Sequence, residues 1–218
     1  MTWSLNEIET LSRKAARGAG LSWGLAEEPG KAARWLAAAG LPGPQVLADL
    51  LTRNDGRDYE TLCPHEEHEG TWIARGGTLC PLISGAALSD HAGRLAQGGA
   101  LTLGRTASPM LLLPYLDAAA QLSGRDITVS WDGVTVACGP AMRPDPGAEA
   151  ALGVAIVDSV TIKSTPSSGN ATPRPAQGRA DIAPETAARL DAFARRTYAP
   201  ETPESRLSGA GAGLTDND

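Results

Sequence analysis

The chain has 218 residues, a formal net charge of −6, and 42% hydrophobic residues, few of which are aromatic. This length suits one large domain or two small ones and can bury roughly 70% of the surface of the unfolded chain. The basic residues are scattered along the sequence. They form no concentrated positive patch that could neutralise the phosphates of a duplex, so we expect no nucleic-acid partner.

Three features favour a soluble, cytoplasmic protein without membrane contact. The N-terminus leads directly into an amphipathic helix and lacks a charged leader followed by an apolar core. The densest apolar stretch, residues 110–116, contains Pro114 and is far shorter than the roughly 20 residues of a membrane span. Three cysteines at irregular spacing favour free thiols over a disulfide framework.

Residues 4–52 are predicted to be mostly helical. Ser4 and Glu7 match a capping box, and apolar residues recur at helical spacing after it. The second helix is expected to begin close to Pro29, because proline is tolerated in a first turn. The predicted helices cover residues 5–17, 26–39 and 45–52. For the second of these, a start nearer Glu27 or Glu28 is the alternative. The polar residues 53–69 are predicted to form an exposed loop.

From residue 71 the pattern changes to short apolar runs separated by glycine, which is typical of strands alternating with helices. Two alternating runs flank Asp132-Gly133, and this arrangement predicts a β-hairpin over residues 127–138. Residues 164–180, rich in Pro, Ser and Gly, are predicted to form a surface loop. Further strands are predicted over residues 71–75, 100–104 and 154–162, and helices over residues 86–96, 109–122 and 184–196.

These elements predict a single α+β domain over residues 1–218. N-terminal helices would pack on a mixed or antiparallel sheet that contains the 127–138 hairpin. The α/β part would cover about residues 70–197 and include a C-terminal helix. An irregular glycine-rich tail, residues 198–218, would follow it.

A first group of candidate functional residues is Cys63, His65 and His68, which lie among glutamates. Thiolate, imidazole and carboxylate groups are transition-metal ligands, and Cys80 and His91 could complete such a site. The spacing matches neither the helical His-Glu-x-x-His motif nor a zinc-finger pair. A solvated acidic loop explains the same residues, and we expect no metal or other cofactor.

A second group is Trp23 with Glu27 and Glu28, at the expected start of the second helix. In one hypothesis Trp23 forms the wall of a pocket, and one acid binds a ligand amine or acts as a general base. In the other, both acids only complement the helix dipole, by roughly 0.3–1 kcal/mol each. Asp90 beside His91 allows the same two interpretations, an acid/base pair or a helix cap.

A third group lies in the tail. Alternating glycines can turn backbone N–H groups toward an anion, and Arg206 could bind a carboxylate through two hydrogen bonds. The alternative is a disordered terminus. The candidate ligand-binding residues of the tail are Tyr198, Ser205, Arg206, Gly209 and Gly211.

Four segments, residues 4–9, 14–20, 23–28 and 198–218, together resemble a bacterial family known only as a domain of unknown function. Its members have about this length. The resemblance implies no activity, but it implies that the tail is a recurring feature and not a ragged end. Pro29 stands where similar sequences have a small helix-forming residue, so the start of the second helix is open.

Two functions are compatible with these observations. The first is a small-molecule metabolic enzyme or enzyme subunit that binds an anionic or zwitterionic metabolite. The second is a noncatalytic binding or assembly protein whose tail docks on a partner or on a second copy, which allows a homo-oligomer. A convergent polar pocket would favour the first function, and a flat apolar patch would favour the second. For the first, the acid/base candidates are Glu27, Glu28 and Asp90, and the ligand-binding candidates are Trp23, Tyr198 and Arg206.

Overall fold

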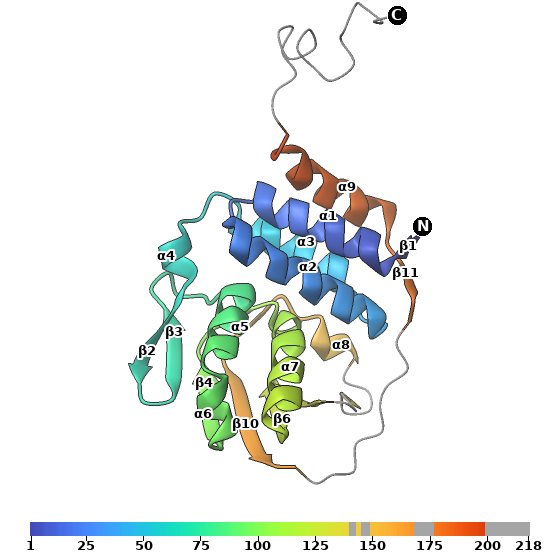
Figure 1. The fold of residues 1–218 in the computed structure, drawn as a ribbon. Coiled ribbons are helices and arrows are strands. Elements are labelled where there is room, and N and C mark those ends of the chain that lie inside the picture. Colours follow the sequence, from blue (N-terminus) through green and yellow to red (C-terminus); the bar gives the residue numbers. More distant parts are fainter. Residues whose placement is uncertain (140–142, 145–148, 168–176, 199–218) are drawn as a thin grey trace, which may run out of the picture.

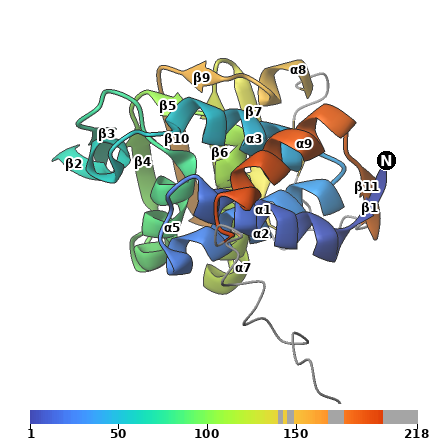
Figure 2. The ribbon, with the colours of Figure 1, turned by 90° about the horizontal axis from the view of Figure 1, so that it is seen from above.

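The computed structural model describes residues 1–139, 143–144, 149–167 and 177–198, and it shows an α+β fold, as predicted. A group of four helices, α1, α2, α3 and α9, forms one end of the molecule (Figure 1). The other end is a sheet with helices α5, α6 and α7 on one face. The view from above shows α9 lying beside α1 although the two are far apart in the sequence (Figure 2).

Small residues build the helical layer. Its four helices are α1 (Leu5–Gly18), α2 (Trp23–Ala38), α3 (Gly43–Asn54) and α9 (Pro184–Arg195). Gly18 lies so close to α9 that a Cβ atom there would overlap the carbonyl oxygen of Phe193. The helices therefore approach almost to backbone contact. The buried alanines of α1 and α2 are Ala15, Ala16, Ala26, Ala32, Ala33 and Ala37.

Serine caps determine where the first two helices, α1 and α2, begin. The capping box is confirmed, because Ser4 Oγ accepts from the Glu7 amide and the Glu7 carboxylate accepts from the Ser4 amide. The expected start of α2 near residues 26–28 is wrong. Ser22 caps the helix by accepting from the Leu25 amide at 3.4 Å, so Pro29 lies two turns inside. The cap at Ser22 therefore determines the start of α2, and the preference of Pro29 for a first turn does not.

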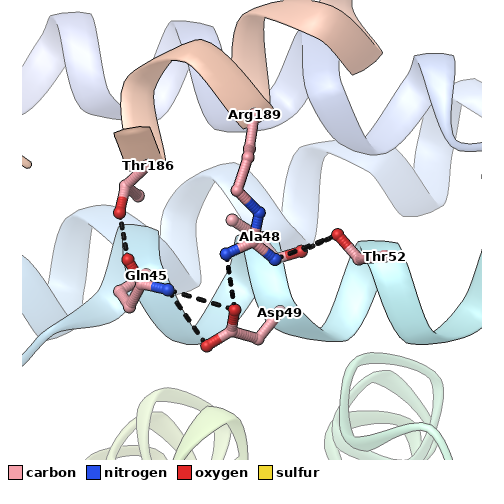
Figure 3. Close-up of polar contacts among 6 residues, drawn as sticks. All are labelled: Gln45, Ala48, Asp49, Thr52, Thr186 and Arg189. Carbon is pink, nitrogen blue, oxygen red and sulfur yellow. Dashed lines mark hydrogen bonds and ion pairs between the residues drawn. The ribbon is translucent and has the colours of Figure 1, made fainter. Parts of the chain in front are cut away.

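A polar cluster fixes α9 against α3 (Figure 3). Thr186 donates to Gln45, whose amide donates to both oxygens of Asp49 at 3.0 and 3.1 Å. Arg189 donates to Asp49 at 2.6 Å and to Thr52 Oγ1 at 3.0 Å. Thr186 is buried and the Asp49–Arg189 pair is partly exposed, and together these contacts set the register of α9 on α3.

Among the described residues, the main sheet has seven strands in the order β2-β3-β4-β10-β6-β7-β8, and only the β3–β4 pair is parallel. It is therefore mixed. Two short pairs, β1–β11 and β5–β9, lie outside it. The strands of the main sheet are β2 (Pro64–His68), β3 (Thr71–Ala74), β4 (Gly99–Leu103), β6 (Arg125–Trp131), β7 (Val134–Cys138), β8 (Arg143–Pro144) and β10 (Val160–Pro166). The others are β1 (Thr2–Ser4), β5 (Thr106–Ala107), β9 (Ile156–Val157) and β11 (Arg179–Asp181).

The predicted 127–138 hairpin is confirmed as β6 and β7. Asp132 and Gly133 both have positive φ, 44° and 78°, as a two-residue turn that matches strand twist requires. Along both strands every second residue is buried. This alternation places one face of the sheet against helices.

The helices on the sheet are α5 (Pro81–Asp90), α6 (Ala92–Ala96) and α7 (Leu113–Ser123). The predicted helix 86–96 is thus two helices that meet at His91. The single helix expected over 109–122 begins as a 3₁₀ turn, η1 (Pro109–Leu112). A short α8 (Glu149–Leu152) completes the order. Among the described residues, no helix has both the length and the apolarity to cross a bilayer.

Two loop predictions need correction. Residues 53–69 include the end of α3, the helix α4 (Tyr59–Leu62) and the edge strand β2, because Asp58 caps α4 and β2 pairs with β3. The predicted loop 164–180 includes the end of β10 and β11, and its residues 168–176 lie outside the described part of the chain. In both places main-chain pairing organises a polar sequence.

Asp117 on α7 joins the two layers. Its carboxylate accepts from the indole N–H of Trp35 on α2 at 3.1 Å and from the amide of Gly139, just after β7, at 3.0 Å. Gln121 donates to it at 2.7 Å. Burial raises the pKa of Asp117, and these three hydrogen bonds oppose that effect. The helical layer therefore meets the sheet layer at a buried carboxylate.

Candidate functional site

A cavity of about 370 Å³ lies where the helical layer meets α4 and the start of α5. Its walls come from the α1–α2 loop, the end of α3, the loop that follows and Cys80 just before α5. We call it the junction pocket. Its lining residues are Ala19, Gly20, Leu21, Leu50, Leu51, Asn54, Gly56, Arg57, Asp58, Tyr59, Leu62, Cys80, Leu82 and Ile83.

The floor of the junction pocket is apolar and buried. Leu50 and Leu51 come from the inward face of α3, and Leu82 comes from the first turn of α5. Leu62, at the end of α4, and Ile83 complete it. Burial in the core favours apolar side chains such as leucine and isoleucine at these positions. An apolar floor in turn favours a ligand with an apolar body.

The rim of the pocket is polar. Asn54 is half-buried, while Arg57, Asp58 and Tyr59 are exposed. The turn between α3 and α4 places them, with the Arg57 amide donating to the Asn54 carbonyl at 3.0 Å. Asp58 accepts from the Glu60 amide at 3.2 Å and so caps α4. One cation and one carboxylate therefore stand at adjacent positions on the rim.

The C-terminal helix holds this rim in place. Arg196, directly after α9, donates to both carboxylate oxygens of Asp55 at 2.7 and 2.9 Å. Asp55 lies between the lining residues Asn54 and Gly56. The side-chain hydrogen bond from Arg196 lowers the pKa of Asp55, so the pair stays charged at neutral pH. The rim is thus tied to an element more than a hundred residues away.

Cys80 and Tyr59, which line the pocket, and the nearby Cys63 are neutral at physiological pH. Burial raises the pKa of Cys80 to about 11. Burial also raises the pKa of Cys63, which donates to the Tyr59 carbonyl at 3.3 Å, and that of Tyr59 itself. A thiol in this state is a poor nucleophile and a poor metal ligand. These groups suit hydrogen bonding and packing.

The other residues of the suggested metal site lie apart from this pocket. His65 and His68 are on the edge strand β2, whereas His91 follows α5. In the part of the chain that the structure describes, no three His, Cys, Asp or Glu side chains are grouped to hold a metal ion. Of the five residues considered, only Cys80 lines the junction pocket.

Glu27 and Glu28 lie on the second turn of α2, beyond the first turn in which acids complement the helix dipole. Glu27 pairs with Arg13 at 3.2 Å, and Glu28 pairs with Lys31 at 2.8 Å. Neither lines the junction pocket. In this structure their main contacts are with surface cations.

Trp23 lies beside the pocket without lining it. Its side chain is 68% exposed at the start of α2, and the guanidinium of Arg17 lies 5.0 Å from its ring centre. Arg17 also donates to the carbonyl of Leu21, a lining residue, at 2.8 Å. The Arg17–Trp23 contact therefore supports the loop that forms one wall.

The remaining candidates lie elsewhere. Asp90 is the exposed last residue of α5, and His91 lines a second cavity near the β2–β3 turn. Tyr198 follows α9, is 58% exposed and has the Lys14 ammonium 5.8 Å from its ring centre. The tail candidates Ser205, Arg206, Gly209 and Gly211 lie outside the described residues.

Sequence reasoning missed the rim of the junction pocket. Arg57, Asp58 and Tyr59 were included in a polar stretch interpreted as loop. One local signal was available, since Asp58 stands four residues before Leu62, as a helix cap stands before an inward apolar residue. No sequence pattern near these residues indicates that α1, α3 and α5 meet around them.

Residues 3–80 match a family described as a protein of unknown function (DUF3726). The match confirms the resemblance to a family of unknown function over about a third of the chain. It contains every lining residue of the junction pocket except Leu82 and Ile83. No curated protein matches the chain. The similarity therefore covers the pocket but brings no activity to it.

Proposed function

We propose that this protein is a small-molecule metabolic enzyme or enzyme subunit that binds an anionic or zwitterionic metabolite in the junction pocket. One observation carries the proposal: an apolar cavity of about 370 Å³ opens at a rim where Arg57 and Asp58 are adjacent. Ligand pockets of proteins are mainly apolar with a few polar groups that fix orientation, and this cavity has that composition.

The size and lining of the cavity define the body of the ligand. Pockets that hold small molecules span roughly 300–1,000 Å³, so this one lies at the small end. The floor of Leu50, Leu51 and Leu82 offers no charged partner, and Cys80 beside it is a neutral thiol. A short aliphatic chain or a small ring fits this environment.

The rim defines the head group. Arg57 makes no ion pair within the described part of the chain, and a guanidinium binds a carboxylate through two parallel hydrogen bonds. Asp58 stands next to it and can accept from an ammonium group. A monocarboxylic acid or an amino acid with an apolar side chain meets both requirements.

If the protein is an enzyme, its chemistry does not start from a thiolate. Cys80 would hold its proton at neutral pH, and so would Cys63. Asp58 is a carboxylate within reach of a bound head group, and Tyr59 is a phenol that keeps its proton. These two residues are the candidates for acid/base work in this pocket.

We place the protein in the cytoplasm as a soluble protein that needs no nucleic acid, membrane or cofactor. A net charge of −6 and scattered basic residues support the absence of a phosphate-binding surface. Three free cysteines fit a reducing compartment. The metabolite would then be an intracellular acid.

The test is thermal unfolding against a panel of short carboxylic acids, hydroxy acids, amino acids and their uncharged esters. A ligand at 100 times its dissociation constant adds about 2.7 kcal/mol, which raises the midpoint of a domain this size by several degrees. We expect one acid class to stabilise the protein and its esters not to. Arg57→Gln should abolish the rise, while Arg53→Gln, an exposed arginine of α3 outside the pocket, should keep it.

A second readout locates the ligand. Cys80 lines the pocket, so an uncharged alkylating reagent should label it slowly at pH 7 and faster as the pH approaches 11. The stabilising acid should slow this labelling further. A flat panel, or a rise that survives Arg57→Gln, would overturn the proposal.

One observation supports the assembly function as a second candidate. A shallow groove of about 350 Å³ runs between α1 and α9 and is lined by Trp3, Leu11, Lys14, Ala194 and Tyr198, among others. Tyr198 is the first residue of the tail and the last residue that the structure describes. Removal of residues 199–218 should then lower the number of chains per particle, which light scattering gives as the measured molar mass divided by the mass of one chain. An unchanged number of chains together with a flat ligand panel would contradict both functions.

A further inference from the structure

Two of the three cysteines, Cys63 and Cys80, meet beside the junction pocket. Cys63 is the C-cap of α4 and Cys80 is the N-cap of α5, and both have extended backbones, with φ of −73° and −84°. Cys80 lines the pocket, while Cys63 follows the lining residue Leu62. The end of one helix and the start of another therefore bring two thiols to one place.

Backbone hydrogen bonds hold the two cysteines side by side. The Cys80 amide donates to the Leu62 carbonyl at 3.2 Å, and the Gly76 amide donates to the Thr61 carbonyl at 2.8 Å. Standard covalent geometry and the first of these bonds keep the Cα atoms of Cys63 and Cys80 within about 7 Å of each other. The Cα atoms of disulfide-bonded cysteines lie roughly 4.4–6.8 Å apart, so this backbone arrangement is compatible with a bond between the two sulfurs.

The two thiols also lie close to the phenol of Tyr59. Burial raises the pKa of that phenol, and a hydrogen bond with Cys63 and the charge of Cys80 add to the rise. Burial likewise raises the pKa of Cys80 to about 11, and the charge of Cys63 adds to it. Interactions between charges weaken with distance, so these effects agree with the short separation of the two backbones. The side chains of Cys63 and Cys80 therefore face the same space beside Tyr59.

The three cysteines differ in their access to solvent. Cys63 is half-buried, whereas Cys80 is only 4% exposed, so a reagent from solution meets Cys63 first. Cys138 is buried in the sheet layer, on β7 opposite Ile127 of β6. Cys138 therefore serves as an internal control for any reaction of the other two thiols.

We infer that Cys63 and Cys80 are an oxidative modification site, at which a low-molecular-weight disulfide converts the two thiols into one intramolecular disulfide. The inference adds a reaction at the junction pocket that the proposed binding of a metabolite does not include. It depends on the two thiols alone, so it holds or fails independently of that metabolite.

The reaction has two exchange steps. The Cys63 thiolate attacks one sulfur of the small disulfide, which gives a mixed disulfide on Cys63 and releases one small thiol. The Cys80 thiolate then attacks the Cys63 sulfur and releases the second small thiol. The protons of the two protein thiols end on the two released thiols. The protein loses two electrons, and the small disulfide gains them.

The cross-link joins the end of α4 to the start of α5 and closes a loop that contains β2 and β3. It also replaces the thiol of Cys80, a lining residue, with a disulfide at the wall of the junction pocket. Disulfides of cytoplasmic proteins are usually transient and respond to oxidants. This one therefore forms when small disulfides accumulate and is removed when reducing conditions return.

The experiment treats the full chain, without denaturant and at mildly alkaline pH, with bis(2-hydroxyethyl) disulfide. Free thiols are then blocked, and the protein is analysed by mass spectrometry before and after digestion. We expect an intact chain that has lost two hydrogen atoms and keeps one of its three thiols, and a peptide that links Cys63 to Cys80. Dithiothreitol should restore all three thiols.

Matched variants separate the two steps. Cys80→Ser should stop the reaction at a mixed disulfide on Cys63, because the second thiol is missing. Cys63→Ser should give no cross-link. Cys138→Ser should form the same cross-link as the natural chain, since the sheet layer takes no part in it.

An equilibrium measurement tests whether the fold holds the two thiols together. In mixtures of the small thiol and its disulfide, the folded chain should become cross-linked at about tenfold less disulfide than the chain in concentrated urea, because proximity raises the effective concentration of one thiol at the other. Equal values in the two states, a cross-link that includes Cys138, or disulfides only between separate chains would each overturn the inference.

Discussion

The helical layer and the sheet layer reach a close-packed interior in opposite ways. Where α1, α2 and α9 meet, glycines and alanines let the backbones approach, and ion pairs such as Arg34–Glu9 surround the seam. In the sheet, large aliphatic side chains such as Ile127, Val129 and Ile162 fill the space under α6 and α7. The sheet layer should therefore suffer most from atoms removed, and the helical layer from atoms added.

The largest effect is expected for Ile162→Ala. Ile162 is fully buried on β10, between Leu101 of β4 and Val129 of β6. Removing its side chain should lower the free energy of unfolding by about 2–5 kcal/mol. Lys163→Ala, the exposed next residue, should change it by less than about 0.5 kcal/mol. Urea unfolding measures both, and similar values for the two would contradict the description of the sheet layer.

An added methyl group tests the helical layer. Gly18→Ala should destabilise the protein by about 1–3 kcal/mol, because the new Cβ would overlap the Phe193 carbonyl oxygen and push α9 away. Gly24→Ala, at an open position of α2, should stabilise it by roughly 0.5–1 kcal/mol through helix propensity alone. Thermal unfolding of the two variants should thus move in opposite directions. A stabilising Gly18→Ala would mean that the seam is loose.

The carboxylate between the layers gives a pH signature. Burial raises the pKa of Asp117 in the folded state, so folding takes up a proton above the ordinary carboxyl pKa of about 4. The stability of the natural protein relative to Asp117→Asn should therefore fall as the pH rises from about 4 toward neutral. Urea unfolding of both proteins across this range measures the difference. A difference that grows with pH would show that the hydrogen bonds outweigh burial.

The smallest effect is expected for Asp49→Ala in the α3–α9 polar cluster. Asp49 and Arg189 are both partly exposed, and surface ion pairs contribute up to about 1 kcal/mol. The loss should shrink further in high salt because screening already weakens the pair. Denaturant unfolding at two salt concentrations checks this. A loss as large as that of Ile162→Ala would mean that polar contacts, and not the glycine and alanine seam, hold α9.

Elements that nearby residues determine could be predicted from the sequence, and elements that depend on distant pairing could not. The 127–138 hairpin follows from Asp132-Gly133 and strict alternation, and the start of α1 follows from Ser4 and Glu7, all within a few residues. The edge strand β2 shows no such alternation, because its Glu66, Glu67 and His68 are all exposed. Its strand structure depends on pairing with β3, which no local pattern records.

The candidate sites depend even more on distant contacts. Cys80 and His91 drew attention as chemical groups, but their different cavities became visible only once α5 was placed between them. Arg57 and Asp58 looked like ordinary loop residues. They become candidate ligand-binding residues because they line the same pocket as Leu50 of α3 and Leu82 of α5, which form its apolar floor. Local sequence cannot encode that convergence.

The seam between α1 and α9 also has a consequence for how the protein is made. Gly18 emerges from the ribosome about 175 residues before Phe193, the residue it packs against. At roughly 5–20 residues per second, this separation corresponds to a wait on the order of ten to thirty seconds. During that time α1 and α2 can pair, but the Arg196 that fixes the turn at Asp55 has not yet been added. The junction pocket can therefore take its final shape only after α9 and Arg196 have been synthesised.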